Sequence, residues 1–222
     1  MRNKKWIVAA VLIGVCLVVG GCSRFDAAAY TQAVLDAVYK NQTESYRELT
    51  EVSKEEAEAF FQNSLNATME AFKSEKLSEE LERNYRNLFE SIMQQVKYTV
   101  GESKKEKDGS YTVKVSVEPV TLFDDTYQLF QQKAEEYAAG VTETVMKGAA
   151  MPTDEEIQEQ VYKLYYEILK AELDAGTKYG APQKITLRVE KLADGDYKIN
   201  REDLKILEEM LISRRVMSQE KS

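Results

Sequence analysis

The chain has 222 residues, of which 43% are hydrophobic and 31% are charged, and its formal net charge at pH 7 is −8. This composition supports a folded core, and the acidic balance argues against binding to nucleic acid or to anionic lipid headgroups. Histidine is absent, which excludes catalysis by an imidazole base and zinc sites with imidazole ligands in their usual forms.

The N-terminal segment has the pattern of a secretory signal peptide. Arg2, Lys4 and Lys5 precede an uncharged apolar run over residues 6–21. A helix of these 16 residues would be about 24 Å long, which is shorter than the roughly 30 Å hydrocarbon core of a bilayer. We therefore expect residues 1–21 to be cleaved as a signal peptide and not to remain as a membrane span.

A cysteine ends this apolar run. The phrase "LVVGGC" over residues 17–22 resembles the lipobox of bacterial lipoproteins. The resemblance implies that the thiol of Cys22 carries a diacylglyceryl group and that the chain is cut before it. An ordinary signal peptide or a short membrane helix is the alternative. Because two or three acyl chains hold a protein firmly at a membrane, we expect a lipid-anchored protein on the extracytoplasmic face of the cell membrane, with residues 22–26 as a tether.

Helices are predicted between the tether and residue 95. Apolar residues recur at helical spacing in residues 27–42, 53–72 and 78–95. Ser53 and Glu56 have the spacing of a capping box, and a serine at position 78 is the expected N-cap of the third helix. Each apolar stripe is one face wide, so these helices must pack on another layer.

The apolar period changes from 3.6 to 2 in residues 96–120, which predicts a β-hairpin. In "YTVKVSVE", residues 111–118, valines alternate with polar residues, as in a sheet that is covered on one face. The polar stretch "GESKKEKDG", residues 101–109, is the expected hairpin loop, ending at Asp108-Gly109.

The same order of helices and then strands follows. We expect helices over 123–175, interrupted at Pro152, then a hairpin over 183–200 and a C-terminal helix over 201–213. The sequence predicts a second capping box at Thr153 and Glu156, a turn at Asp194-Gly195 and an N-cap at Asn200.

Together these elements predict one α+β domain over residues 27–217. Its helices would pack on one face of a roughly four-stranded antiparallel sheet built from the two hairpins, since one-sided strands need a shared core. The similar phrases "DGSYTVKV" and "DGDYKI" at 108–115 and 194–199 leave a duplicated unit as the alternative.

Two resemblances bear on this fold. The segment "DGDYKIN" resembles the last strands of the nuclear-transport-factor-two-like and cystatin-like α+β folds. From "FDAAAYTQAVLDAVYKNQ" to "DGDYKINREDL", the chain resembles a family of uncharacterised lipoproteins of Gram-positive bacteria. That family resemblance implies the cellular location and the fold, and it implies no activity.

Carboxylate pairs are the remaining candidates for catalysis or metal binding. Paired acids can act in glycoside hydrolysis, and carboxylates alone can bind calcium. The pairs are Asp124 and Asp125, Glu135 and Glu136, Glu208 and Glu209, and Asp194 with Asp196. The first three pairs are predicted at a helix start or on solvated helical faces, and the last in a tight turn. We expect no catalytic residue, no metal site and no cofactor.

Tyrosine is abundant, with 13 residues. Tyr162, Tyr165, Tyr166 and Tyr179 could line a ligand pocket or lie at the edge of the core. Two hypotheses for function follow. The first is a non-catalytic interaction or accessory module with an envelope protein as its partner, and the alternative binds a small ligand in a cavity between the helices and the sheet.

Overall fold

The computed structural model describes residues 25–72, 77–193 and 195–213. The predicted signal peptide, Cys22 and the first residues of the tether lie outside this part of the chain, as do Asp194 of the predicted turn and the last four residues of the predicted domain.

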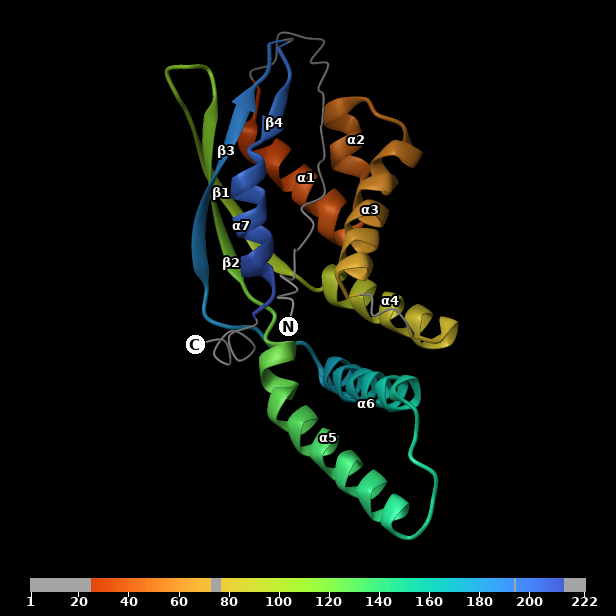
Figure 1. Cartoon of the computed structure of the whole chain (residues 1–222). Coiled ribbons are helices and arrows are strands. Elements are labelled where there is room, and N and C mark those ends of the chain that lie inside the picture. The colour runs from red at the N-terminus through yellow and green to blue at the C-terminus, as the bar shows by residue number, and fades with distance from the viewer. Residues whose placement is uncertain (1–24, 73–76, 194, 214–222) are drawn as a thin grey trace.

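The described part folds as an α+β domain (Figure 1), which confirms the predicted class. Its elements in chain order are α1 (Ala27–Lys40), α2 (Glu44–Thr50), α3 (Lys54–Phe72), α4 (Glu79–Gln94), β1 (Lys97–Lys105), β2 (Tyr111–Glu118), α5 (Leu122–Met146), α6 (Asp154–Ala175), β3 (Gln183–Lys191), β4 (Tyr197–Ile199) and α7 (Arg201–Leu211).

The two hairpins form one antiparallel sheet with the strand order β1-β2-β3-β4. The central pairing joins β2 to β3, with Tyr111 opposite Val189 and Val115 opposite Ile185. Burial alternates along β2, so that its tyrosine and valines face the helices while its polar residues face outward. Of the two alternatives for the hairpins, the structure shows the shared sheet.

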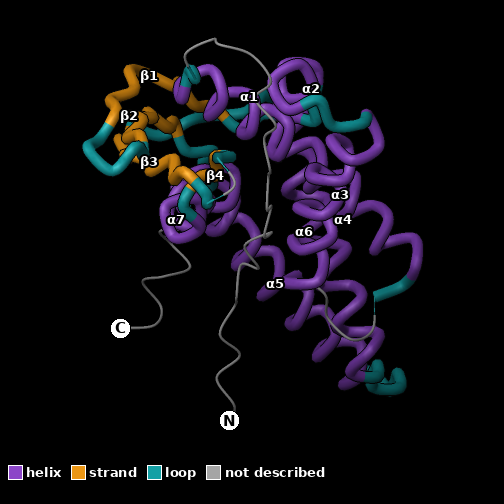
Figure 2. Tube along the Cα trace, turned by 90° about the horizontal axis from the view of Figure 1, so that it is seen from above, coloured by secondary structure: helices purple, strands orange, loops and turns teal. Residues whose placement is uncertain are grey.

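The helices form more than one layer. Figure 2 shows α1 and α7 lying against the sheet, with α2, α3 and α4 beyond α1. The contacts agree: α1 packs on β1 and β2, α7 packs on β2 and β3, and α2, α3 and α4 all pack on α1. The core therefore lies between the sheet and α1, and continues outward to the large buried side chains of α3 and α4, including Phe61, Tyr85 and Ile92.

Local signals at the helix ends agree with the sequence. Ser53 and Glu56 exchange reciprocal hydrogen bonds of 3.0 and 3.1 Å before α3. The hydroxyl of Ser78 caps α4, and Asn200 caps α7. These side chains satisfy backbone N–H groups that have no partner inside the helix.

Two local predictions were incomplete. Strand β1 continues to Lys105, through residues predicted as loop, with an irregular register between Val100 and Ser103. Its outer half is polar because it lies at the sheet edge, where backbone pairing to β2 holds it without burial. Helix α2 was not predicted, because it is only seven residues long and lies between two residues of positive φ, Asn41 and Glu51.

Candidate functional site

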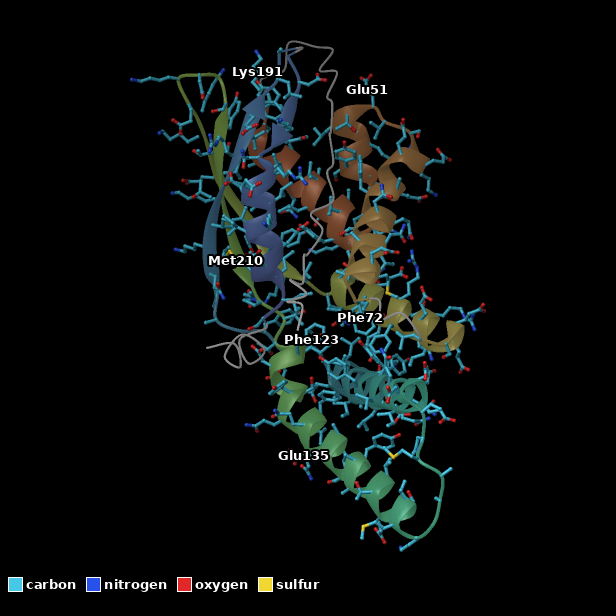
Figure 3. The ribbon with its side chains drawn as sticks, in the orientation of Figure 1. Glu51, Phe72, Phe123, Glu135, Lys191 and Met210 are labelled. Atoms are coloured by element: carbon cyan, nitrogen blue, oxygen red, sulfur yellow. The ribbon has the colours of Figure 1, made fainter. Side chains whose placement is uncertain are left out.

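A pair of helices projects from the rest of the domain. We call residues 122–175 the arm; it contains α5, α6 and their connection, and we call the other described residues the body. Figure 1 shows the arm extending from the end of the sheet where β2 finishes. In Figure 3, Phe123 lies at the base of the arm and Glu135 lies part-way along it. The arm is thus continuous with the central strand but extends beyond the core.

Local sequence explains the start and the turn of the arm. The first residues of α5, Leu122, Phe123 and Thr126, are buried at its base. At the far end, Gly148 has a φ of 97°, and Thr153 forms a capping box with Glu156 at the start of α6. The chain therefore passes from α5 to α6 through residues 147–153, and the capping box at Thr153 that the sequence predicted is present.

Burial falls along the arm. After Thr126, no residue of α5, all of which is described, is buried. The buried residues of α6 are Ile168, Leu169 and Leu173, all in its second half. Near the base, the rings of Phe130 and Tyr165 are 4.6 Å apart. Helix α5 packs substantially against α6 alone, and Figure 1 shows the two helices diverging toward the far end of the arm.

Exposed apolar side chains gather on the arm. Met146 and Met151, on either side of the turn, are 83% and 63% exposed, and Leu129 on α5 is 46% exposed. Among the described residues, the two methionines are the most exposed large hydrophobic side chains. Sequence reasoning missed them, although the phrase "MKGAAMP" at 146–152 has little polar character for an exposed turn.

The arm also carries the charge imbalance of the chain. Residues 122–175 contain twelve acidic and four basic residues, a formal net charge of −8. The whole chain contains 38 acidic and 30 basic residues, which leaves 26 of each sign outside the arm. Most of the acidic character noted from composition thus belongs to one region.

The tether enters the body at the opposite end of the sheet. The ring of Phe25 stacks on Tyr197, with centroids 3.7 Å apart, and meets Tyr111 edge-on. Tyr111 is the first residue of β2, and α5 begins soon after Glu118, the last residue of that strand. Lys191, near the same end as Phe25, lies far from the arm in Figure 3.

The four predicted pocket tyrosines are not gathered around one space. Tyr162 and Tyr166 both contact Tyr85 of α4, whose hydroxyl donates a 2.7 Å hydrogen bond to the carbonyl of Tyr162. Tyr165 instead faces Phe130, and Tyr179 donates to the carbonyl of Gln95 at the end of α4. They join α6 and the following loop to their neighbours, and their role in ligand binding stays a prediction.

Two hollows lie on the surface near α4. One, between α3 and α4, is lined by charged and polar residues that include Arg86, which already donates to Asn66 and Gln62. The other lies where α4 and α6 begin, and there Glu159 accepts hydrogen bonds from Ser78. None of the four predicted pocket tyrosines lines either hollow.

The acidic pairs differ in environment. Asp125 accepts a hydrogen bond from Thr121, and Glu136 accepts one from Lys133, as expected for helix starts and solvated faces. Glu208 contradicts the expectation of a solvated face, because it is half-buried and its Oε1 accepts a 3.2 Å hydrogen bond from the Tyr39 hydroxyl. Burial raises the pKa of Glu208 to about 7.

Glu208 does not share its half-buried position with the other acid of the predicted pair. Its sequence neighbour Glu209 is exposed. The Oε2 of Glu208 is buried and accepts no hydrogen bond from the described residues. A similar contact lies nearby on α1, where the hydroxyl of Tyr98 donates to Asp36 at 2.6 Å. These contacts tie α7 and the sheet to α1.

Comparison with known proteins bears on the fold. No protein-family model and no curated protein matches the sequence. A solved structure that does match is the protein ycdA of Bacillus subtilis subsp. subtilis str. 168, assigned as a lipoprotein, with a TM-score of 0.56 and 15% sequence identity. The match covers 85% of this chain and 56% of that one, so this chain corresponds to about half of its neighbour.

At this identity the likeness shows a shared fold. It agrees with the predicted resemblance to lipoproteins, while the resemblance to the nuclear-transport-factor-two-like and cystatin-like folds stays a prediction. Among the described residues, no helix is both long enough and apolar enough to cross a membrane.

Proposed function

We propose that this chain is a lipoprotein anchored through Cys22 to the extracytoplasmic face of the cell membrane. There it acts as a non-catalytic interaction or accessory module for an envelope protein. The observation that carries the proposal is the arm, whose apolar residues are left partly uncovered by the body. Exposed apolar surface of this kind marks sites where proteins meet partners.

The position of Phe25 in the body supports a definite orientation. Three residues of chain, from Cys22 to Phe25, span at most about 10 Å. A lipid on Cys22 would hold the end of the body around Phe25 close to the membrane. From there, β2 runs about 25 Å and α5 about a further 37 Å, and Figure 1 shows both directed away from the end of the sheet at which α1 begins. The arm would then extend into the aqueous space, on the order of 50 Å from the anchor.

The charge distribution favours the same orientation. Once residues 1–21 are cleaved, the chain outside the arm keeps 26 acidic and 23 basic residues, a formal net charge of −3, whereas the arm has a net charge of −8. Anionic headgroups repel acidic surfaces, so the arm is the region least suited to lie on the membrane.

Lipidation is tested by metabolic labelling with a palmitate analogue. The wild-type chain should be labelled, and Cys22→Ala should not be. Label that persists on Cys22→Ala would refute the lipid anchor at this residue.

The interaction role is tested by chemical crosslinking of the tagged chain in cells, followed by mass spectrometry. We expect the anchored chain to capture a reproducible envelope protein that Cys22→Ala, made to the same level, does not capture. Turnover of a substrate by the purified protein, abolished by one carboxylate substitution such as Glu208→Gln, would contradict a non-catalytic role.

A further inference from the structure

The outer face of the sheet, which is turned away from α1 and α7 (Figure 2), is rich in basic side chains. Of the residues in register across the four strands, eight ionisable ones alternate with the inward-facing residues and so lie on this face. Two of them are acidic, and six are basic: Lys97, Lys104, Lys114, Lys184, Arg188 and Lys198. The face therefore has a formal charge of +4, although the chain as a whole is acidic.

Half of the basic residues are already paired with acids at the margins of the face. The ion pairs are Lys97 with Glu118, Lys198 with Glu190 and Lys104 with Glu106, at 2.7, 3.6 and 3.3 Å between nitrogen and oxygen. The central three, Lys114, Lys184 and Arg188, are exposed, and among the described residues no acid forms an ion pair with them. Hydrogen bonds from Ser110, together with the nearby charge of Arg188, lower the pKa of Asp108 in the hairpin loop.

These three cations are close neighbours. Lys114 lies diagonally across from both Lys184 and Arg188 in the pairing of β2 with β3. Diagonal neighbours in an antiparallel sheet have Cβ atoms about 7–8 Å apart. Positive charges at this separation repel one another, and an anion bound among them would remove the repulsion.

A hydroxyl side chain lies directly opposite each of these cations. The pairs are Lys114 with Thr186, Lys184 with Ser116 and Arg188 with Thr112, and we call these six residues the basic patch. Opposite residues have Cβ atoms about 4.5–5.5 Å apart, so a cation and a hydroxyl can reach one anion together. The hydroxyl of Thr112 already donates to Glu106 at 3.1 Å, whereas those of Ser116 and Thr186 donate to no described group.

The spacing of the basic patch suits anionic groups that repeat along a chain. Successive pairs are two residues apart along the strands, which is about 7 Å. The patch is an open sheet face, and none of its residues lines either surface hollow near α4. A phosphate group accepts hydrogen bonds from a cation and a hydroxyl at once. A backbone of six bonds per repeat, extended as fully as a polypeptide, is about 7 Å long.

We propose that the basic patch binds a linear polymer of phosphodiester groups outside the cell membrane, with successive phosphates at the three pairs. The cellular location rests on the proposed lipid anchor, whereas the chemistry rests on the patch alone. In the proposed orientation the strands run away from the membrane. The patch then faces sideways into the aqueous space, so a polymer there is favoured over the headgroups of the membrane itself.

The acidic arm of a second copy fits the basic patch less well. Copies anchored in one membrane would all hold their patches closer to it than their arms, because the arm begins where β2 finishes. Contact between the arm of one copy and the patch of another would require one of them to be inverted. A dimer formed through the patch is therefore a result that would overturn the proposal.

The test uses the full lipidated chain in nanodiscs of zwitterionic phosphatidylcholine, with empty nanodiscs as the blank. The probe is fluorescent poly(glycerol phosphate), whose repeat has six bonds between phosphorus atoms. We expect it to bind, and to bind about tenfold more weakly when the salt rises from about 0.05 to 0.5 M. Poly-glutamate of equal charge should bind about tenfold more weakly, because each carboxylate lies on a flexible side chain that binding must order.

Two double variants locate the binding. Lys114→Gln/Lys184→Gln removes two charges of the basic patch, and Lys163→Gln/Lys205→Gln removes two charges at exposed residues of α6 and α7. We expect the patch variant to weaken polymer binding about tenfold and the control variant to leave it within about twofold. Circular dichroism should show the same secondary structure in both.

Four results would overturn the inference: no binding of the phosphate polymer, equal binding of poly-glutamate, equal affinity of the two variants, or a dimer in sedimentation that the patch variant abolishes. If the anchored chain still captures its envelope partner in cells while any of these is found, this inference fails and the proposed function stands. If the polymer binds as expected and no envelope protein is captured, the patch recognises phosphate polymers but the proposed function fails.

Discussion

Helices α4 and α5 differ in what surrounds them. Both carry apolar residues at helical spacing, yet the 16 residues of α4 include six buried ones, whereas the 25 residues of α5 include three, all within its first five positions. Helix α4 lies among α1, α3 and α6, and α5 leaves the body after its first turns. Periodicity thus indicates an amphipathic helix, while the number of packed neighbours decides how much of its stripe is buried.

The largest expected difference between body and arm is the stability cost of removing an apolar side chain. Phe61→Ala in the body removes a ring that is 0% exposed, and it should lower the free energy of unfolding by about 3–5 kcal/mol. Leu129→Ala on the arm removes a side chain that is 46% exposed, and it should change that free energy by no more than about 0.5 kcal/mol.

Denaturant unfolding of the two variants measures both effects. Equal losses for Phe61→Ala and Leu129→Ala would show that α5 is as closely packed as the body, and the distinction between body and arm would then be wrong.

The second prediction concerns pH. The pKa of Glu208 in the body is raised to about 7, chiefly by burial, whereas the unfolded chain has the ordinary value near 4.3. Between these values the folded state binds more protons than the unfolded state, so the contribution of Glu208 to stability falls as pH rises from about 4.5 to about 7. Glu208→Gln should reduce the loss of stability between pH 4.5 and pH 8 by about 1–3 kcal/mol.

The groups that act on the pKa of Glu208 all belong to the body. Tyr39 donates a hydrogen bond to it, and Glu209 is the neighbouring charge. Denaturant unfolding across the pH range is the measurement, and the exposed Glu209→Gln is the matched control, for which we expect the wild-type pH dependence. An unchanged pH dependence in Glu208→Gln would contradict the assigned environment of this carboxyl group.

A smaller difference in the free energy of unfolding is expected when the N-cap side chains of α4 and α6 are removed. Ser78→Ala in the body should lower the global free energy of unfolding by about 1 kcal/mol, because α4 unfolds with the core. Thr153→Ala removes the capping box at the tip of the arm, where the first half of α6 can open without the body. Its global effect should stay within about 0.5 kcal/mol.

Hydrogen exchange distinguishes the two caps. Thr153→Ala should speed exchange of the first turns of α6 several-fold and leave α4 unchanged. Exchange that rises throughout the chain in Thr153→Ala would mean that the arm and the body unfold as one unit.

Much of the body could be predicted from sequence because its signals are local. Alternating valines in β2 fixed the covered face of the strand, and Ser53, Ser78 and Asn200 marked helix starts that the structure confirms. The outer half of β1 was not predicted, because a polar edge strand is held by backbone hydrogen bonds that leave no apolar pattern.

The candidate site was harder to predict because it depends on tertiary contacts. The half-buried Tyr137, Val141 and Val145 of α5 have the same helical spacing as a buried stripe, and nothing local says that α5 has one main neighbour. Glu208 could have been found, since it lies four residues after Leu204 and three before Leu211 and so shares their helical face. Its burial was missed because acidic residues on a helix were assigned to the solvent.

The central claim is that the body holds the chain at the membrane while the arm reaches a protein partner. The most direct test places a photo-crosslinking amino acid in the full chain in cells, at the exposed Ala138 of the arm or the exposed Glu102 of the body. We predict a protein adduct from Ala138 that is lost with Cys22→Ala, and no protein adduct from Glu102. An adduct from Glu102 alone would contradict the account.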